Sequence, residues 1–150
     1  MSTRPGTERR HDGRSPARRH RAREVALRVL FEIEGTGKDP EQALHYQAQD
    51  MSAPPDVVSY ARTLVLGCLE HREAVDSAIV SASAHWKLED LGKVERALLR
   101  LSVYELMFQP GTPTPVAIDE AVELARTYAG EEARSYVNGV LGNIAAMGGS

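Results

Sequence analysis

The segment Pro16–Glu34 limits the fold most strongly, because it predicts a helix that is apolar around most of its circumference. Ser15 is a suitable N-cap, Pro16 fits the first helical position, and Gly35 follows the end of the segment. With about 100° of rotation per residue, only a narrow strip stays polar, and it consists of Arg21, Glu24, Arg28 and Glu32. A helix of this kind must be surrounded by other helices.

The rest of the chain also has helical periodicity, and no alternating strand pattern of useful length occurs. Pro- and Gly-containing stretches separate six further segments. We predict helices at about 39–50, 56–69, around Val75, Ile79, Ala82 and Trp86, and at about 91–108, 114–130 and 132–147. This pattern predicts an all-α fold, a compact bundle of about seven helices in one domain over residues 16–150. Residues 1–15 contain almost nothing apolar and are expected to form a disordered basic arm.

Charge is divided unevenly along the chain. Residues 1–24 hold eight arginines and three acidic residues, a net charge of +5. The remaining residues hold ten basic and eighteen acidic side chains, a net charge of -8. This division indicates an anionic partner for the start of the chain and a basic partner for its body.

No pattern in the sequence indicates an enzyme. The chain lacks the phosphate-binding loop, the dinucleotide fingerprint, the zinc-protease motif and the nucleophile elbow, so we predict no catalytic residues and no cofactor. The five histidines lack metal-ligand spacing, and the single cysteine, Cys68, lies among apolar residues and is expected to be a core side chain. No apolar run approaches the ~20 residues needed to cross a bilayer, and no secretory signal is evident, so we expect a cytoplasmic protein without membrane contact.

Three residues break the apolar pattern of the predicted helices. Glu105 falls on the apolar stripe of the segment 91–108, and we interpret it as a buried carboxylate that ties helices together. The alternative role, a general base, has no accompanying nucleophile or cofactor motif. Gly139 and Gly142 lie inside the last predicted helix, where each costs roughly 1 kcal/mol relative to Ala. We expect them to let a neighbouring helix approach closely.

The arginines at the start of the first helix are the strongest functional signal. Arg18 neighbours Arg21, Arg19 neighbours Arg23, and His20 lies among them. Their charges repel one another and oppose the helix macrodipole. A bound anion would offset both effects, and Arg can bind phosphate with two parallel hydrogen bonds. No DNA-binding motif is present, so single-stranded RNA fits better; an incidental basic tail is the alternative.

Three stretches resemble the NusB family of bacterial transcription antitermination factors. They are ARRHRAREVALRVLFEIE (17–34), LGKVERALLRLSVYEL (91–106) and PVAIDEAVELARTYAGEEARSYVNGVLGNIA (115–145), the last with the family's VNGVL signature. The resemblance implies seven helices and no enzymatic activity. It also implies binding of the boxA element of nascent RNA, notably in ribosomal RNA leaders, together with a small-subunit ribosomal protein known as NusE. That complex helps RNA polymerase to read through terminators.

The same resemblance implies roles for individual residues. Arg19, His20, Arg21 and Arg23 match the family's RNA-binding run, and Arg18 adjoins it. Tyr136 matches an aromatic position associated with RNA, and Arg134 lies close enough in sequence to reach phosphate. Glu89 and Glu95 match the region that meets the ribosomal protein.

One alternative function and one mutational expectation follow from the sequence. The alternative is a helical protein-interaction adaptor whose basic arm is incidental. The expectation is that replacing Arg21 and Arg23 with Ala weakens RNA binding and leaves thermal stability equal or slightly higher, because the conflict with the macrodipole is relieved.

Overall fold

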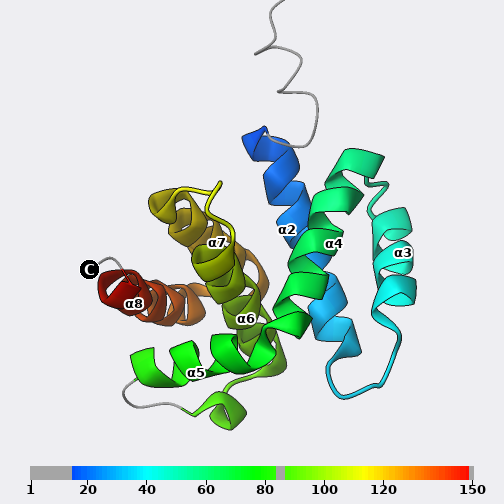
Figure 1. Cartoon of the computed structure of the whole chain (residues 1–150). Helices are drawn as coiled ribbons and strands as arrows, with labels where there is room; N and C mark the ends of the chain where they lie inside the picture. Colours follow the sequence, from blue (N-terminus) through cyan, green and yellow to red (C-terminus); the bar gives the residue numbers. More distant parts are fainter. Residues whose placement is uncertain (1–14, 84–86, 149–150) are drawn as a thin grey trace, which may run out of the picture. The chain divides into compact units, whose positions relative to one another are not determined.

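The computed structural model describes residues 15–83 and 87–148. These residues form seven α-helices and one short 3-10 helix, and they contain no strand (Figure 1). The helices are α2 (Pro16–Ile33), α3 (Pro40–Asp50), α4 (Pro55–Glu70), α5 (Arg72–Ala82), η1 (Leu88–Asp90), α6 (Lys93–Phe108), α7 (Thr114–Ala129) and α8 (Glu131–Gly148). The all-α prediction is therefore confirmed. The predicted arm up to residue 14 and the predicted helical position of Trp86 lie outside the described residues.

The chain divides into two compact units, and the boundary between Leu66 and Gly67 falls inside α4. The first unit holds α2, α3 and most of α4. The second unit holds the last residues of α4 and all of α5, η1, α6, α7 and α8.

Local sequence signals fix the helix ends of the first unit as predicted. The Ser15 hydroxyl accepts a hydrogen bond from the backbone N–H of Arg18 at 3.3 Å, and Pro16 occupies the first turn of α2. Asp39 does the same for α3, since its carboxylate accepts from the N–H of Gln42 at 3.1 Å. Such caps satisfy N–H groups that have no partner within the helix.

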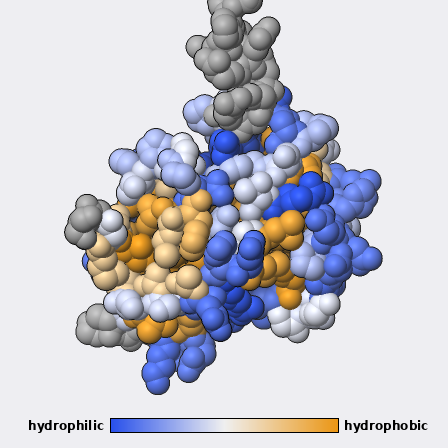
Figure 2. Space-filling model, in the orientation of Figure 1, coloured by the Kyte–Doolittle hydropathy of each residue, from blue (hydrophilic) through white to orange (hydrophobic). Residues whose placement is uncertain are grey.

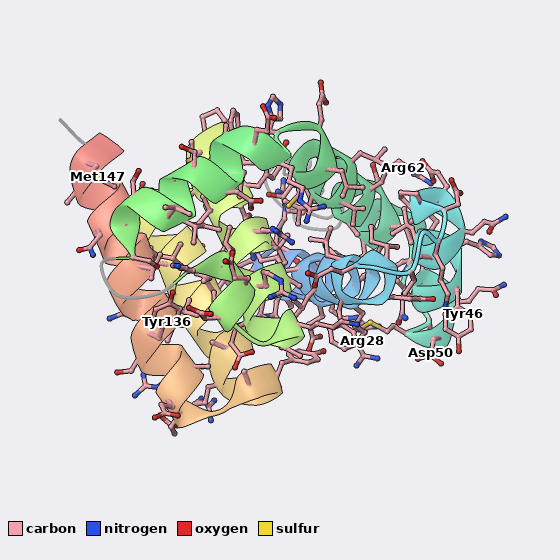
Figure 3. The ribbon with its side chains drawn as sticks, turned by 90° about the horizontal axis from the view of Figure 1, so that it is seen from below. Arg28, Tyr46, Asp50, Arg62, Tyr136 and Met147 are labelled. Carbon is pink, nitrogen blue, oxygen red and sulfur yellow. The ribbon has the colours of Figure 1, made fainter. Side chains whose placement is uncertain are left out.

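The polar strip of α2 faces α3 and is used in contacts with it. The Arg21 guanidinium donates to the carbonyl oxygen of Met51, at the C-cap of α3. Arg28 lies 3.8 Å from the carboxylate of Asp50, and the two side chains lie next to each other in Figure 3. Further along, the Gln47 amide donates to Glu32 at 2.9 Å. Arg21, Arg28 and Glu32 of the predicted polar strip therefore form a row of polar contacts with α3 and its C-cap residue.

Glu32 holds two donors at the end of this row. Its other carboxylate oxygen pairs with the Lys38 ammonium at 2.9 Å. The hydrogen bond from Gln47 and then the pairing with Lys38 lower the pKa of Glu32. Both interactions favour the ionised carboxylate, so they contribute to stability above the ordinary pKa and are lost as the pH falls through the lowered one.

In the second unit, α7 packs against α6 and α8, and α5 packs against α6 and α8. The buried face of α7 consists mostly of alanines. Ile118, Val122 and Tyr128 are only half-buried, whereas the fully buried residues are Ala117, Ala121, Leu124 and Ala125. Alanines on the inner face let α7 lie close to its neighbours, and the larger side chains cover the edges of the contact.

The glycines of α8 do not have the packing role expected from the sequence. Gly139 and Gly142 are exposed, and a Cβ atom built on either would meet no other described atom within 4 Å. They lie opposite the buried residues of α8, which include Val137, Val140 and Ile144. A close contact does occur at Gly67, where a Cβ atom would overlap the Tyr104 hydroxyl group.

Glu105 is buried, as predicted, and its carboxylate contacts the loop that follows α6. Its side chain is 2% exposed, and the Thr112 hydroxyl in the loop after α6 donates to its Oε2 at 3.2 Å. The carboxylate thus fastens the loop to α6.

Cys68 is also buried, at 2% exposure, and burial raises the pKa of its thiol to about 12. A thiol with such a pKa carries almost no thiolate near neutral pH, so it is a core side chain and not a nucleophile.

Among the described residues, no helix is long and apolar enough to cross a membrane.

Candidate nucleic-acid interface

The arginine cluster at the start of α2 lies beside the first turns of α4. The Arg18 guanidinium pairs with the Asp56 carboxylate at 3.0 Å, and both side chains are partly exposed. Asp56 is in the first turn of α4, where negative charge also interacts favourably with the helix dipole. Arg18 is therefore held by a charge from the same unit.

Arg19 has an aromatic partner that also lies on α4. Its Cζ atom lies 3.5 Å from the centroid of the Tyr60 ring. This is a van der Waals contact distance and is well within the range of cation–π attraction. Tyr60 follows Asp56 by four residues, so both project from one face of α4.

Arg21 and His20, the next two members of the cluster, also contact groups of the first unit. Arg21 is exposed and donates to the Met51 carbonyl oxygen. His20 is half-buried, and its Nε2 atom lies 4.0 Å from the carboxylate of Glu24. A protonated His20 would gain from this carboxylate, whereas a neutral one gains little.

Arg23 does not belong to the exposed cluster. It is 3% exposed, although the sequence comparison with the family's RNA-binding run placed it with Arg19 and Arg21. Arg23 lies on the same side of α2 as the buried residues Ala22 and Ala26. A buried guanidinium has no surface to offer a ligand, so Arg23 is not placed to contact RNA, contrary to the prediction.

These contacts explain how the protein tolerates several arginine charges close together. A carboxylate, a ring and a carbonyl oxygen already stabilise Arg18, Arg19 and Arg21 without a ligand. A bound anion is therefore not needed to offset the repulsion within the cluster. The same contacts fix the directions of the guanidinium groups, and a fixed array of donors suits the recognition of phosphates.

The remaining residues predicted to bind RNA lie in the second unit, on α8. Arg134 is exposed, and its Nε donates to Glu131 at 2.8 Å. Tyr136 projects from α8 (Figure 3). Its hydroxyl forms a 2.8 Å hydrogen bond with the Ser83 hydroxyl, and the residue is half-buried. The Tyr136 hydroxyl is thus used within the protein, while the residue as a whole remains partly exposed.

The predicted contacts for a basic protein partner lie where η1 leads into α6. Glu89 is exposed on η1, and Arg96 donates to the carbonyl oxygens of Leu88 and Leu91 at 3.1 Å and 2.8 Å. Arg96 therefore fixes the turn that carries Glu89. The Glu95 carboxylate folds back over Gly92, where an added Cβ atom would overlap its Oε1. Gly92 is the N-cap of α6, so Glu95 holds the position from which acidic residues favour a helix start.

No side-chain cluster among the described residues indicates a metal site. They contain no group of three or more His, Cys, Asp or Glu side chains that could hold a metal ion. An open groove of about 660 Å³ lies between α3 and α4, and its lining is mixed, with Leu44, Ala48 and Val58 beside His45 and Arg62. Its polar groups do not form a converging set of the kind that orients a cofactor.

Sequence reasoning missed Asp56 and Tyr60. Their spacing of four residues indicates that they share a helix face, but nothing in the sequence indicates that this face meets the start of α2. That the two helices pack together at this point is seen only in the tertiary structure.

The sequence model of the NusB family matches residues 20–146. The chain belongs to the NusB family. Relatives named transcription antitermination protein NusB agree with this assignment. The protein from Exiguobacterium sp. is 41% identical over 127 residues, covering 85% of this chain and 96% of its own. The protein from Sorangium cellulosum is 42% identical over 127 residues, covering 85% of this chain and 91% of its own.

Solved structures of NusB proteins have the same fold. NusB in a complex of the antitermination factors NusB and NusE with double-stranded RNA matches with a TM-score of 0.80 and 32% identity. That match covers 87% of this chain and 98% of the solved one. NusB from T. maritima matches with a TM-score of 0.78 and 35% identity, covering 85% and 90% of the two chains.

These matches confirm the family that the three sequence stretches indicated. They also confirm the predicted helical fold and the assignment to transcription antitermination factors, which are not enzymes.

Proposed function

We propose that this NusB-family chain binds boxA-type single-stranded RNA in nascent ribosomal RNA transcripts. It does so together with the small-subunit ribosomal protein NusE, and the complex promotes read-through by RNA polymerase. The observation that carries the proposal is the ordered guanidinium array of Arg18, Arg19 and Arg21. It lies in a fold whose solved relative is in complex with NusE and RNA.

The chemistry of the array suits RNA. Guanidinium groups bind phosphate oxygens with paired hydrogen bonds, and their planar faces can stack on unpaired bases. Arg21 is exposed, and His20 adds charge when protonated. On α8, Arg134 would contact phosphate and the exposed part of the Tyr136 ring would stack on a base.

The acidic body suits a basic protein partner. Residues 25–150 carry a net charge of -8, and Glu89 is exposed on a turn that Arg96 holds in place. Complementary charge speeds encounter and excludes wrongly charged partners. We assign Glu89 and Glu95 to the surface that meets the ribosomal protein.

Competition binding tests this proposal. Labelled boxA RNA is titrated with the full chain, with and without the ribosomal protein, against scrambled RNA and against a double-stranded version of the same sequence. We expect a preference for single-stranded boxA RNA that increases when the ribosomal protein is present. Equal binding of boxA and scrambled RNA under both conditions would contradict the proposal. Binding of the ribosomal protein without any RNA preference would instead support the adaptor function.

A matched pair of arginine variants adds a control. Arg21→Ala is expected to weaken RNA binding roughly tenfold, which corresponds to about 1.4 kcal/mol. Arg126→Ala removes the same charge from α7, where Arg126 pairs with Glu123, and is expected to leave RNA binding nearly unchanged.

A further inference from the structure

The aromatic ring of Tyr60 lies against the arginine cluster, where it contacts Arg19. The Arg19 Cζ atom lies 3.5 Å from its ring centroid, which is the separation of stacked planar groups. Both residues are half-buried, so the pair lies at the edge of the protein surface. The ring therefore supports Arg19 where a ligand can reach it.

The neighbouring arginine, Arg18, is also held by a residue of α4. Asp56, one helical turn before Tyr60, holds Arg18 at 3.0 Å. One face of α4 thus fixes two consecutive guanidinium groups of α2 with two different kinds of interaction. Tyr60 adds no charge that would repel a phosphate, whereas Asp56 does, so Tyr60 is the residue whose effect can be measured cleanly.

We propose that Tyr60 is a positioning residue of the RNA site, where it holds the Arg19 guanidinium ready for a phosphate or base of the bound RNA. This inference rests on the proposed function. A free Arg side chain loses much rotational freedom when it binds, and a guanidinium already resting on a ring loses less. Preorganisation by Tyr60 increases affinity without Tyr60 itself needing to touch the RNA.

A double-mutant cycle tests the proposal by comparing Tyr60→Leu, Arg19→Ala and the double variant for binding of boxA RNA. We expect Tyr60→Leu to weaken binding roughly three- to tenfold. In the Arg19→Ala background the same substitution should have almost no further effect, because the group that it positions is gone. Tyr60→Phe keeps the ring and should bind like the wild type.

Two further variants keep the result interpretable. Tyr46→Leu removes a 60% exposed aromatic side chain from α3 and should leave RNA binding unchanged. Arg19→Lys keeps the charge but lacks a planar face, so it should weaken binding while the slope of affinity against salt stays the same. This second variant remains informative if Tyr60→Leu proves too unstable to purify.

The outcomes separate the two proposals. If the wild-type chain shows no preference for boxA RNA, the proposed function fails. If the wild type binds but Tyr60→Leu binds equally well, the positioning role of Tyr60 is wrong. Independent, additive effects of Tyr60→Leu and Arg19→Ala would overturn it as well.

Discussion

The hydroxyl oxygens of Ser83 and Tyr136 lie 2.8 Å apart and join the end of α5 to α8. A second contact reinforces this connection, because the Asn143 amide donates to the Ala82 carbonyl oxygen at 3.1 Å. Two residues of α8 thus hold the chain where it leaves α5. Tyr136 consequently has two separable parts, a hydroxyl used for structure and a ring to which the proposed function assigns base stacking.

Replacing Tyr136 by Phe separates these parts. The variant loses the hydrogen bond to Ser83, and we expect its free energy of unfolding to fall by about 1 kcal/mol. Its RNA affinity should stay near that of the wild type, because the ring remains, whereas Tyr136→Ala should lose affinity as well. Ser83→Ala is the control that removes the same hydrogen bond from the other side. An equal loss of RNA affinity in the Phe and Ala variants would contradict the stacking role.

Arg21 and Arg23 should respond differently to substitution by Ala. Arg23 is buried and has partners within the protein, so its removal is expected to lower the free energy of unfolding by about 2 kcal/mol or more. Arg21 is exposed, and its removal should change stability by less than about 1 kcal/mol. Urea unfolding of the two single variants measures both. Equal stability of the Arg23→Ala variant and the wild type would restore the original expectation for the pair.

Replacing an exposed glycine of α8 should make the protein more stable, in contrast to replacing Arg23. Because an added Cβ atom meets nothing, Gly139→Ala should raise the free energy of unfolding by up to about 1 kcal/mol. Thermal unfolding of the single variant is the measurement. Gly67→Ala is the contrasting control, since the methyl group would overlap the Tyr104 hydroxyl and should destabilise the protein. A less stable Gly139→Ala variant would show that this face of α8 is covered.

Cys68 makes stability depend on pH in the alkaline range. Its ordinary pKa is 9.0, and burial raises the pKa to about 12 in the folded chain. Between these values the unfolded chain loses the thiol proton and the folded chain keeps it, so stability falls as the pH rises, by up to about 1.4 kcal/mol per pH unit. The difference in unfolding free energy between wild type and Cys68→Ala, measured from pH 8 to 11, isolates this group. A difference that is constant with pH would contradict the raised pKa.

Helix ends and helix type were predictable because their causes are local. Ser15, Pro16, Asp39 and Pro40 act within one turn of the backbone, and the structure places helix starts at these residues. The start of α6 was predicted two residues too early. Leu91 and Gly92 have extended backbone angles, and η1 precedes them, so the apolar stripe begins before the helix does.

The environment of the arginines was not predictable, because it depends on α4. Arg23 is the exception, because steps of about 100° put it on the side of α2 opposite the polar strip, where its side chain is buried. The charges of Arg18 and Arg19 seemed to need an external anion, yet Asp56 and Tyr60 contact them from about forty residues further along the chain. Sequence patterns identified the cluster, but only the tertiary structure shows which of its members are exposed and how they are held.

The salt dependence of boxA RNA binding tests the central claim most directly. Each phosphate neutralised in single-stranded RNA should contribute about -0.7 to the slope of log affinity against log salt. We predict a steep negative slope for the wild type that becomes shallower by about one contact in Arg21→Ala, with no change in Arg126→Ala. A slope near zero, or the same slope in all three proteins, would contradict RNA recognition by the start of α2.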